Sequence, residues 1–351
     1  MKDHAPEGFQ YPSTRYSGSK RRLVDWIWEK VRDLPFDSVL DAFGGTGSVS
    51  LLFKRYGKKV FYNDLLKFNQ IIAKAIIEND AVKVTSEDIE EVLQFSSKRY
   101  PAFVQEEYTG VFFIDEENAW LDKIATNILR INNEYKKAIF LASLFQACLA
   151  KRPFNLFHRA NLSVRQASVS RTFGNKTTWE HPFPDLFKRY VAEYNSAVFS
   201  NGRRNKVVGG HDALLAPNGV DLVYLDPPYF SAISSRGTNY LAFYHFLEGL
   251  ADYENWPARI SSKNSGFRRI PDSDEISRFT KKAEIVTSFC RLLNRFRDNV
   301  IVLSYQSNGI PTRDEIEHML GDLGKDVRVY SRRHRYVLSP HPNHELLFVA
   351  T

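Results

Sequence analysis

Apolar runs and amphipathic segments alternate along the first 80 residues and again after residue 206. Buried strands are expected where short runs are mostly aliphatic or aromatic, at 38–43, 59–62, 207–208, 220–225 and 299–305. Helices are expected where apolar residues recur at helical spacing, at 23–31, 49–56, 70–77, 241–253 and 276–296. Strands that alternate with helices in this way predict an α/β fold with a parallel sheet. The last apolar stretches predict closing strands that pair antiparallel, at 326–330, 336–338 and 345–349.

The middle of the chain, 81–205, differs in pattern and in charge. Amphipathic or buried helices are expected at 116–130 and 135–150. Residues 81–130 hold ten acidic and five basic side chains, whereas 151–206 hold eleven Lys or Arg and three Asp or Glu. Such a reversal of sign suggests that the second part binds a polyanion. A solvated basic loop around core aromatics is the alternative.

The stretch 151–165 interleaves basic, amide and aromatic side chains. Cations neutralise phosphates, and Arg or Asn side chains can read base edges. The candidates for contact with nucleic acid are Lys151, Arg152, His158, Arg159, Asn161 and Arg165.

Composition sets the class of protein. The 351 residues are 43% hydrophobic and 25% charged, which is enough for a full core and for two domains. We find no apolar run that could span a bilayer and no secretory signal, and two cysteines cannot form a disulfide framework. The composition therefore favours a cytosolic protein. No group of His, Cys, Asp and Glu has metal-ligand spacing, and the net charge of +7 makes a polyanionic partner plausible.

The strongest candidate for chemistry is Asp226-Pro227-Pro228-Tyr229, which follows the run 220–225. Because Pro cannot donate to a sheet and restricts the residue before it, the strand ends here in a rigid tetrapeptide. Ligands bind at the carboxyl ends of strands in open α/β sheets. A carboxylate and a proline carbonyl can accept hydrogen bonds from an exocyclic amine, while the aromatic ring stacks on its base. An ordinary turn that ends a strand is the alternative.

A glycine-rich turn follows the first predicted strand. Gly45 and Gly47 allow a ligand to approach the backbone at the start of the helix 49–56. Asp64 comes after the second strand, where an acid can accept hydrogen bonds from ribose hydroxyls. Asp212 follows the strand 207–208 and could accept from a cofactor amine; a turn residue is the alternative.

These residues together resemble the D12 class of adenine-N6 DNA methyltransferases, the Dam-like α group. Arg15 to Lys20 resembles the N-terminal cofactor motif of that family, and Asp41 to Gly47 fits its D-x-F-x-G-x-G loop. Asp226 to Tyr229 is its catalytic tetrapeptide, unaltered, and a long insert separates the loop from the tetrapeptide as in the family. The cofactor residues that this resemblance implies are Tyr16, Lys20, Asp41, Phe43, Gly45, Gly47, Asp64 and Asp212.

The resemblance implies a Rossmann-like sheet of seven strands, one of them reversed, and S-adenosylmethionine as cofactor. Residues 1–80 and 206–351 would form the catalytic domain, and 81–205 an inserted, mostly helical domain that recognises DNA. The partner would be double-stranded DNA in the cytoplasm or nucleoid, and no metal or membrane is expected. The resemblance is compatible with a cognate restriction endonuclease and with a monomer or weak dimer.

The implied reaction is direct methyl transfer to N6 of an adenine that is flipped out of the duplex. Hydrogen bonds to Asp226 and Pro227 would localise the nitrogen lone pair, and Tyr229 would stack on the base. Cytosine-N4 methylation uses the same geometry and stays an alternative, as does methylation of RNA or of a protein amide. From another class, the chain could be a DNA-binding protein with an inactive methyltransferase fold.

Overall fold

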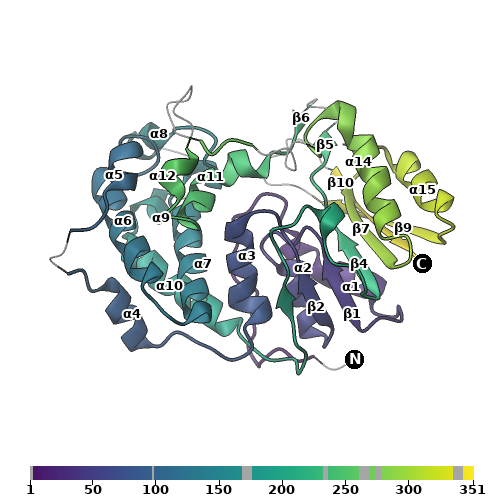
Figure 1. Cartoon of the computed structure of the whole chain (residues 1–351), viewed down its shortest axis with the longest axis horizontal. Helices are drawn as coiled ribbons and strands as arrows, with labels where there is room; N and C mark the ends of the chain where they lie inside the picture. The colour runs from purple at the N-terminus through teal and green to yellow at the C-terminus, as the bar shows by residue number, and fades with distance from the viewer. Residues whose placement is uncertain are drawn as a thin grey trace.

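A mixed sheet forms one half of the molecule (Figure 1). The computed structural model describes residues 3–96, 99–167, 176–231, 236–260, 269–272, 278–334 and 343–351, and over these the sheet has seven strands in the order β3-β2-β1-β4-β7-β10-β9. Their bounds are Ser38–Asp41 (β1), Lys59–Tyr62 (β2), Lys206–Val207 (β3), Leu222–Leu225 (β4), Val300–Gln306 (β7), Val327–His334 (β9) and Asn343–Ala350 (β10). Strand β10 runs antiparallel to both neighbours, and the strands β3 to β7 pair in parallel. The predicted Rossmann-like sheet with one reversed strand is confirmed.

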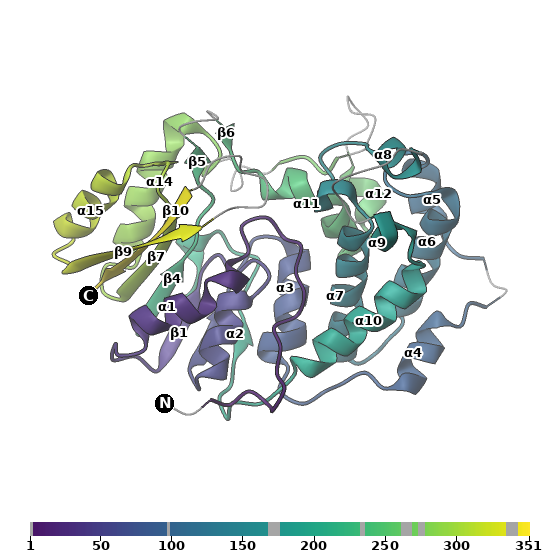
Figure 2. The same cartoon turned by 180° about the vertical axis from the view of Figure 1, so that it is seen from behind.

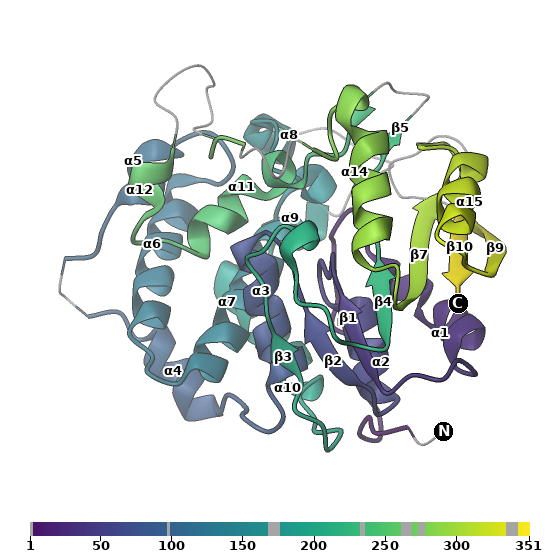
Figure 3. The same cartoon turned by 45° about the vertical axis from the view of Figure 1, so that its right-hand side comes forward.

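Helices cover both faces of the sheet, because the central strands are apolar on both sides. All four residues of β4 are buried, and neighbouring residues along β1 belong to different cores, Val39 to one and Leu40 to the other. One face carries α1 and α2, and the other carries α14 and α15 (Figures 1 and 3). The bounds of these helices are Val24–Val31 (α1), Ser48–Arg55 (α2), Lys282–Arg295 (α14) and Arg313–Asp322 (α15).

Most predicted elements agree with the structure to within a few residues. The strand at 59–62 has the predicted bounds, and the predicted helix 70–77 is α3 (Lys67–Ala73) continued by a π-helical turn at Lys74–Glu78. The helix predicted over 276–296 begins only at Lys282, because Phe279 turns inward and packs against Phe43. The strand predicted at 336–338 lies outside the described residues.

Helices of the middle of the chain form a second lobe beside the sheet (Figure 2). Its central helix is the buried α7 (Glu134–Ala150), which packs against α10 (Phe183–Ser196) and α3. The helices between α3 and β3 are α4 (Ser86–Leu93), α5 (Phe103–Glu107), α6 (Asp115–Leu129), α7 (Glu134–Ala150), α8 (Leu162–Gln166), α9 (Lys176–Glu180) and α10 (Phe183–Ser196). No helix among the described residues is both long and apolar enough to cross a bilayer.

The helical lobe shares a hydrophobic core with the sheet half. Phe68 of α3 packs edge-on against Phe145 of α7, with ring centroids 6.0 Å apart. Two later helices, α11 (Tyr240–Leu250) and α12 (Trp256–Arg259), also lie on this side, and α11 packs against α3 and α7 (Figure 3). The lobe thus takes in residues beyond 81–205, and the proposed domain boundaries stay a prediction.

A buried carboxylate on α11 fixes this helix to the start of α3. Glu248 accepts hydrogen bonds from the backbone N–H groups of Lys67 and Phe68, each at 3.1 Å. These groups lack partners within their own helix, because a helix leaves its first N–H groups unpaired. Leu66 at the helix start makes no side-chain capping bond, so Glu248 supplies the cap from a distant part of the chain. These two hydrogen bonds fix α11 against the first turn of α3, beside the sheet.

Candidate active site

The cleft for a ligand is expected between β1 and β4, because the chain leaves these two neighbouring strands in opposite directions along the sheet. Asp41 is the last residue of β1 and pairs in register with Tyr224 of β4. Asp226 follows two residues later, directly beyond the end of β4. The glycine loop and the tetrapeptide, which are about 180 residues apart in sequence, therefore meet at one point of the fold.

The glycine loop is held close to the end of β2. A Cβ atom on Gly44 would lie 2.1 Å from the ring of Tyr62, so no larger residue fits there without displacing that ring. The Tyr62 hydroxyl donates to the carbonyl of Gly45 at 2.5 Å. Gly45 and Gly47 have φ angles of 51° and 73°, in the left-handed region that favours glycine. Because the glycines carry no side chains, space for a ligand remains directly beside the backbone of the loop.

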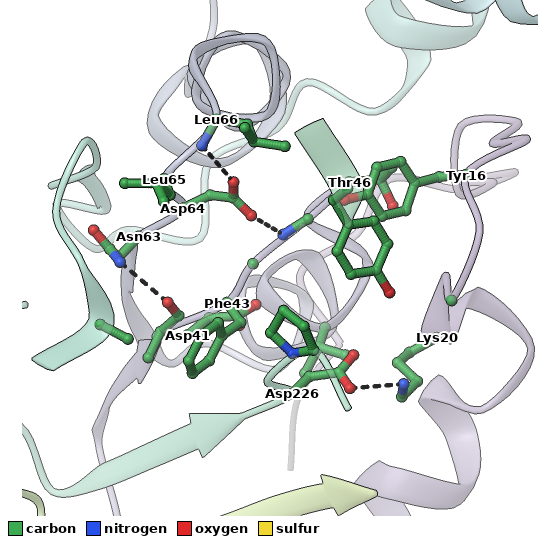
Figure 4. A pocket seen from close by; sticks show the side chains of 18 of the residues that line it. Tyr16, Lys20, Asp41, Phe43, Thr46, Asn63, Asp64, Leu65, Leu66 and Asp226 are labelled. Carbon is green, nitrogen blue, oxygen red and sulfur yellow. Dashed lines mark hydrogen bonds and ion pairs between the residues drawn. The ribbon is translucent and has the colours of Figure 1, made fainter. Parts of the chain in front are cut away.

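Two carboxylates, the buried Asp41 and the partly buried Asp64, flank this space (Figure 4). Asp64 accepts from the backbone N–H groups of Gly45 at 2.9 Å and Leu66 at 2.8 Å, while burial raises its pKa. Asp41 accepts from the Ser50 hydroxyl at 2.7 Å through one oxygen. Its other oxygen, Oδ1, is buried and has no hydrogen-bond partner among the described residues. Burial, with smaller contributions from nearby carboxylates, raises the pKa of Asp41 to about 7.

Asp226 belongs to a largely buried cluster of three charged side chains. The Lys20 ammonium lies 2.8 Å from Asp226 Oδ1 and 3.3 Å from Glu345 Oε1. Glu345 comes from β10, is fully buried, and accepts from the Ser304 hydroxyl at 2.6 Å. Burial raises the pKa of Asp226 to about 6; Lys20 opposes this shift and Glu345 adds to it.

Glu345 was missed by the sequence reasoning. The only signal available was a charged residue directly before the apolar part of a strand, and nothing local to it shows that Lys20 lies opposite. Lys20 was predicted as a cofactor residue. It does line the pocket, and in addition it pairs with the carboxylate predicted to be catalytic.

Aromatic rings form one wall of the pocket. Tyr16 stacks on Tyr240 and on Tyr244, with ring centroids 5.3 Å and 4.6 Å apart. On the opposite side, Phe43 meets Phe279 edge-on at 5.6 Å. Both Tyr16 and Phe43 were predicted from sequence, whereas Tyr240 and Phe279 were not, because no motif marks them.

Asp212 also reaches the pocket, and it is already paired. One carboxylate oxygen accepts from the backbone N–H of Leu214 at 3.1 Å, at the start of the short 3-10 helix Ala213–Leu215. The other carboxylate oxygen forms an ion pair with Arg278. A ligand amine that used this carboxylate would have to share it with the guanidinium.

The predicted cofactor and catalytic residues converge on this single pocket. Those that line it are Tyr16, Lys20, Asp41, Phe43, Gly45, Asp64, Asp212, Asp226 and Pro228. Gly47, Pro227 and Tyr229 are not in the lining, and each is a chain neighbour of a residue that is. Tyr229 is partly buried and approaches Tyr305 edge-on at 6.4 Å. The roles of these residues stay predictions.

The six residues predicted to contact nucleic acid fall into two groups. Lys151 and Arg165 are largely buried, and both pair with Glu117 of α6 at 2.7 Å. Arg152 is 1% exposed, and its guanidinium donates to the carbonyls of Leu156 and Arg159. These three cations bind protein groups in this conformation.

The other three are more accessible. Arg159 is exposed, whereas His158 and Asn161 are half-buried. Direct contact of any of the six with DNA stays a prediction. Among the described residues, no group of three or more His, Cys, Asp or Glu side chains could hold a metal ion.

A seven-stranded sheet with one reversed strand, with a glycine loop and an acidic tetrapeptide at its switch point, is typical of Rossmann-like methyltransferases. Comparison with known families specifies the class: the D12 class N6 adenine-specific DNA methyltransferase family matches residues 16–319. The chain belongs to this family, and it is an adenine-N6 DNA methyltransferase. The resemblance inferred from sequence is confirmed.

Individual relatives agree with this assignment. The type II methyltransferase M2.HphI of Haemophilus parahaemolyticus is 32% identical over 97% of this chain and 98% of its own length. The type II methyltransferase M.NlaIII of Neisseria lactamica is 23% identical, with 92% of each chain covered. The type II methyltransferase M.FokI of Planomicrobium okeanokoites is 27% identical over 95% of this chain, which spans 52% of that protein.

Proposed function

We propose that this chain transfers the methyl group of S-adenosylmethionine to N6 of an adenine flipped out of double-stranded DNA. We further propose that it is the modification enzyme of a type II restriction–modification system, as the names of its relatives suggest. One observation carries the proposal: the tetrapeptide at Asp226 and the glycine loop after Asp41 open into the same pocket. A methyl donor and an acceptor amine would meet there.

The cofactor side of the pocket fits a cationic ligand. Asp41 is a buried carboxylate with one unpartnered oxygen among the described residues and a raised pKa, so a positive charge nearby would stabilise its ionised form. Bound S-adenosylmethionine would supply a methyl group made electrophilic by its sulfonium. We assign Asp64 to the ribose hydroxyls and Asp212 to the adenine amine. Gly45 and Gly47 allow close approach to the backbone, and Tyr16 and Phe43 provide apolar walls.

The acceptor side is built around Asp226. Adenine N6 is a weak nucleophile because its lone pair is delocalised into the ring. Hydrogen bonds from N6–H to the Asp226 carboxylate and the Pro227 carbonyl would localise this pair, while Tyr229 stacks on the base. Lys20 holds the carboxylate at 2.8 Å, so its orientation is set before the base arrives. Once the nitrogen carries the methyl group its proton is acidic, and Asp226 can accept it.

The helical lobe would hold the duplex, since the target amine is paired inside it and must be extruded. We propose that Arg159, with His158 and Asn161, contacts the DNA. We assign Lys151, Arg152 and Arg165 mainly to the scaffold that presents these three, because their charges are engaged by protein groups. A restriction endonuclease of the same specificity, a monomer or weak dimer, and a nucleoid-associated cytoplasmic location complete the proposal.

The first experiment is methyl transfer from labelled S-adenosylmethionine to unmethylated bacterial DNA, followed by digestion to nucleosides. We expect label in N6-methyladenine, and sequencing of the modified sites then gives the specificity. Label in N4-methylcytosine would keep the site and correct the base. Cofactor binding without label would indicate RNA or another acceptor. Neither binding nor label would refute the proposed activity in favour of an inactive DNA-binding protein.

A further inference from the structure

Tyr244 of α11 is a buried aromatic residue that holds the segment before Lys20. Its hydroxyl accepts a hydrogen bond from the backbone N–H of Ser17 at 2.6 Å. Its ring stacks on that of Tyr16, with centroids 4.6 Å apart and an angle of 16° between the two ring planes. Because Ser17 and Tyr244 are 227 positions apart in sequence, no local pattern reveals this contact.

A tight turn leads from Ser17 to Lys20, and it packs against the same helix. Gly18 has a φ of 81°, in the left-handed region that favours glycine. A Cβ atom on Gly18 would lie 2.7 Å from the hydroxyl oxygen of Tyr240, the first residue of α11. The backbone of the turn therefore lies directly against α11, and a larger residue would displace one of the two.

Lys20 follows this turn and reaches the carboxylate that is predicted to be catalytic. It is the first residue of the 3-10 helix Lys20–Arg22, and its ammonium lies 2.8 Å from Asp226 Oδ1. Tyr16 and Lys20 lie on the same side of the pocket (Figure 4). Since only four positions separate them in sequence, a contact that fixes Tyr16 and its neighbour also limits where Lys20 can lie.

Tyr244 sits on a part of α11 that is bonded to the helical lobe. Its chain neighbours both contact Phe157: the backbone N–H of Phe157 donates to the carbonyl of Phe243 at 2.8 Å, and the carbonyl of Phe157 lies 3.0 Å from His245 Nε2. Between these two bonds Tyr244 departs from helical backbone angles, with a φ of −125° and a ψ of 16°. The lobe thus sets the position of Tyr244 from the side away from the pocket.

We propose that Tyr244 is a positioning residue for methyl transfer, which fixes Tyr16 as a wall of the cofactor pocket and places Lys20 against Asp226. This inference rests on the proposed function, which gives those three residues their roles. The two parts of the side chain act separately. The ring supports Tyr16, and the hydroxyl holds the backbone that leads to Lys20. Tyr244 does not line the pocket, so it acts through these residues and not on the donor or the base.

The placement of Lys20 can be measured through the ionisation of Asp226. Burial raises the pKa of Asp226 to about 6, Lys20 opposes this shift, and Glu345 adds to it. A lysine that is held less firmly opposes the shift less, so the pKa rises further. In the proposed mechanism the carboxylate must be ionised to accept from the amine. Loosening Lys20 therefore moves the acidic limb of kcat/KM to higher pH.

The test compares Tyr244→Phe, which removes only the hydroxyl, with Tyr244→Leu, which removes the ring as well. Tyr253→Phe is the matched control, since Tyr253 is also buried and its hydroxyl donates to Asp122 inside the helical lobe. Methyl transfer to DNA is measured for each protein between about pH 4 and pH 9. Binding of S-adenosylmethionine without DNA and the melting temperature are measured beside it.

We expect Tyr244→Phe to move the acidic limb up by about 0.5 to 1 pH unit, the size of one lost hydrogen bond, and to bind the cofactor within about twofold of wild type. Tyr244→Leu should move the limb as well and weaken cofactor binding by about three- to tenfold, the range of one aromatic pair. Tyr253→Phe should leave both quantities in place, even where it lowers the melting temperature. In a Lys20→Met background, Tyr244→Phe should cause no further shift of the limb, because the lysine through which it acts is gone.

An unmoved limb in Tyr244→Phe would overturn the placement of Lys20, and unchanged cofactor binding in Tyr244→Leu would overturn the support of Tyr16. A limb shift of equal size in the Lys20→Met background would show that Tyr244 acts by another route, which also overturns the proposal. The same changes in Tyr253→Phe would reduce the effect to lost stability and have the same consequence. A wild-type protein without methyl transfer would refute the proposed function itself, a result distinct from all of these.

Discussion

Replacing Glu345 with glutamine is expected to move the acidic limb of the pH–rate profile to lower pH. In the proposed mechanism Asp226 must be ionised to accept from N6–H, so activity rises as pH increases through its pKa, which is about 6. Burial is the main cause of that raised pKa, and the Glu345 charge adds to it. Glu345→Gln removes the charge and can keep the hydrogen bonds to Ser304 and Lys20. The pKa of Asp226 should therefore fall.

The size of the effect follows from the geometry. The two carboxylate oxygens are at most 6.1 Å apart, since 2.8 Å and 3.3 Å lead from them to the same Lys20 nitrogen. Two unit charges at that distance interact by about 0.7 kcal/mol in water and about 2.7 kcal/mol at an effective dielectric constant of 20. Glu345 is fully buried and Asp226 is 22% exposed, so the larger value is the better guide. At 1.36 kcal/mol per pH unit, that interaction energy corresponds to a downward shift of the limb by about two pH units.

The assay is kcat/KM for methyl transfer between about pH 3.5 and pH 8, a range that includes the shifted limb, because this quantity reports ionisation in the free enzyme. Lys20→Met gives the opposite perturbation: it removes the neighbouring cation and should move the limb to higher pH. Glu248→Gln is the control, since it alters a buried carboxylate that caps α3 and should leave the limb in place. A Glu345→Gln profile with its limb unmoved or shifted upward would refute the reasoning.

Four further predictions test the site and the helical lobe. Asp226→Ala should abolish transfer in the labelled assay and retain measurable DNA binding; retained transfer would remove Asp226 from its role. Gly44→Ala should lower the free energy of unfolding by more than about 1 kcal/mol, because the added methyl group clashes with the ring of Tyr62 in β2. Gly321→Ala is the control: nothing lies close to a Cβ atom at this position of α15, so it should be neutral or stabilising in the same denaturant titration. Arg152→Met should destabilise the fold by at least about 2 kcal/mol, because it leaves buried carbonyls unpaired. Arg159→Ala should leave the free energy of unfolding unchanged and lower the slope of log K for DNA binding against log[salt] by about one. A stable Arg152→Met protein with weakened DNA binding, together with a destabilised Arg159→Ala protein, would contradict the assignment of Arg152 to the scaffold and Arg159 to DNA contact.

Sequence alone predicts the sheet well because its central strands are short, continuous apolar runs. The run 220–225 is followed by Asp226 and two prolines, and these prolines fix the end of β4 directly before Asp226. The glycine loop can be predicted equally well, because the positive φ angles at these positions favour glycine, and Gly45 and Gly47 are found there. At the prolines and at the glycines, the residue type alone indicates the backbone conformation that the fold has there.

The features of the site that the sequence does not reveal depend on contacts between residues far apart in the chain. Glu345 enters the site only because β10 inserts antiparallel between β7 and β9, and a strand pattern does not reveal its neighbours. The basic stretch 151–165 shows the complementary difficulty. A charge pattern cannot separate Arg159, which is exposed, from Arg152, whose cation is engaged by carbonyls and rings inside the lobe.

The two sides of the pocket differ in charge: one side has a carboxylate without a cation, and the other has a carboxylate paired with a lysine. This difference matches the proposed cationic donor and neutral acceptor. On the donor side Asp41 is buried and has an oxygen without a partner among the described residues, so a positive ligand would relieve the cost of its ionisation. On the acceptor side Asp226 already has a cation at 2.8 Å, and Lys20 is itself shared with Glu345. A neutral adenine adds no charge to that cluster and needs only an oriented acceptor. In the proposed mechanism Lys20 would keep Asp226 ionised and oriented, while Asp41 and Asp64 across the pocket would serve the donor.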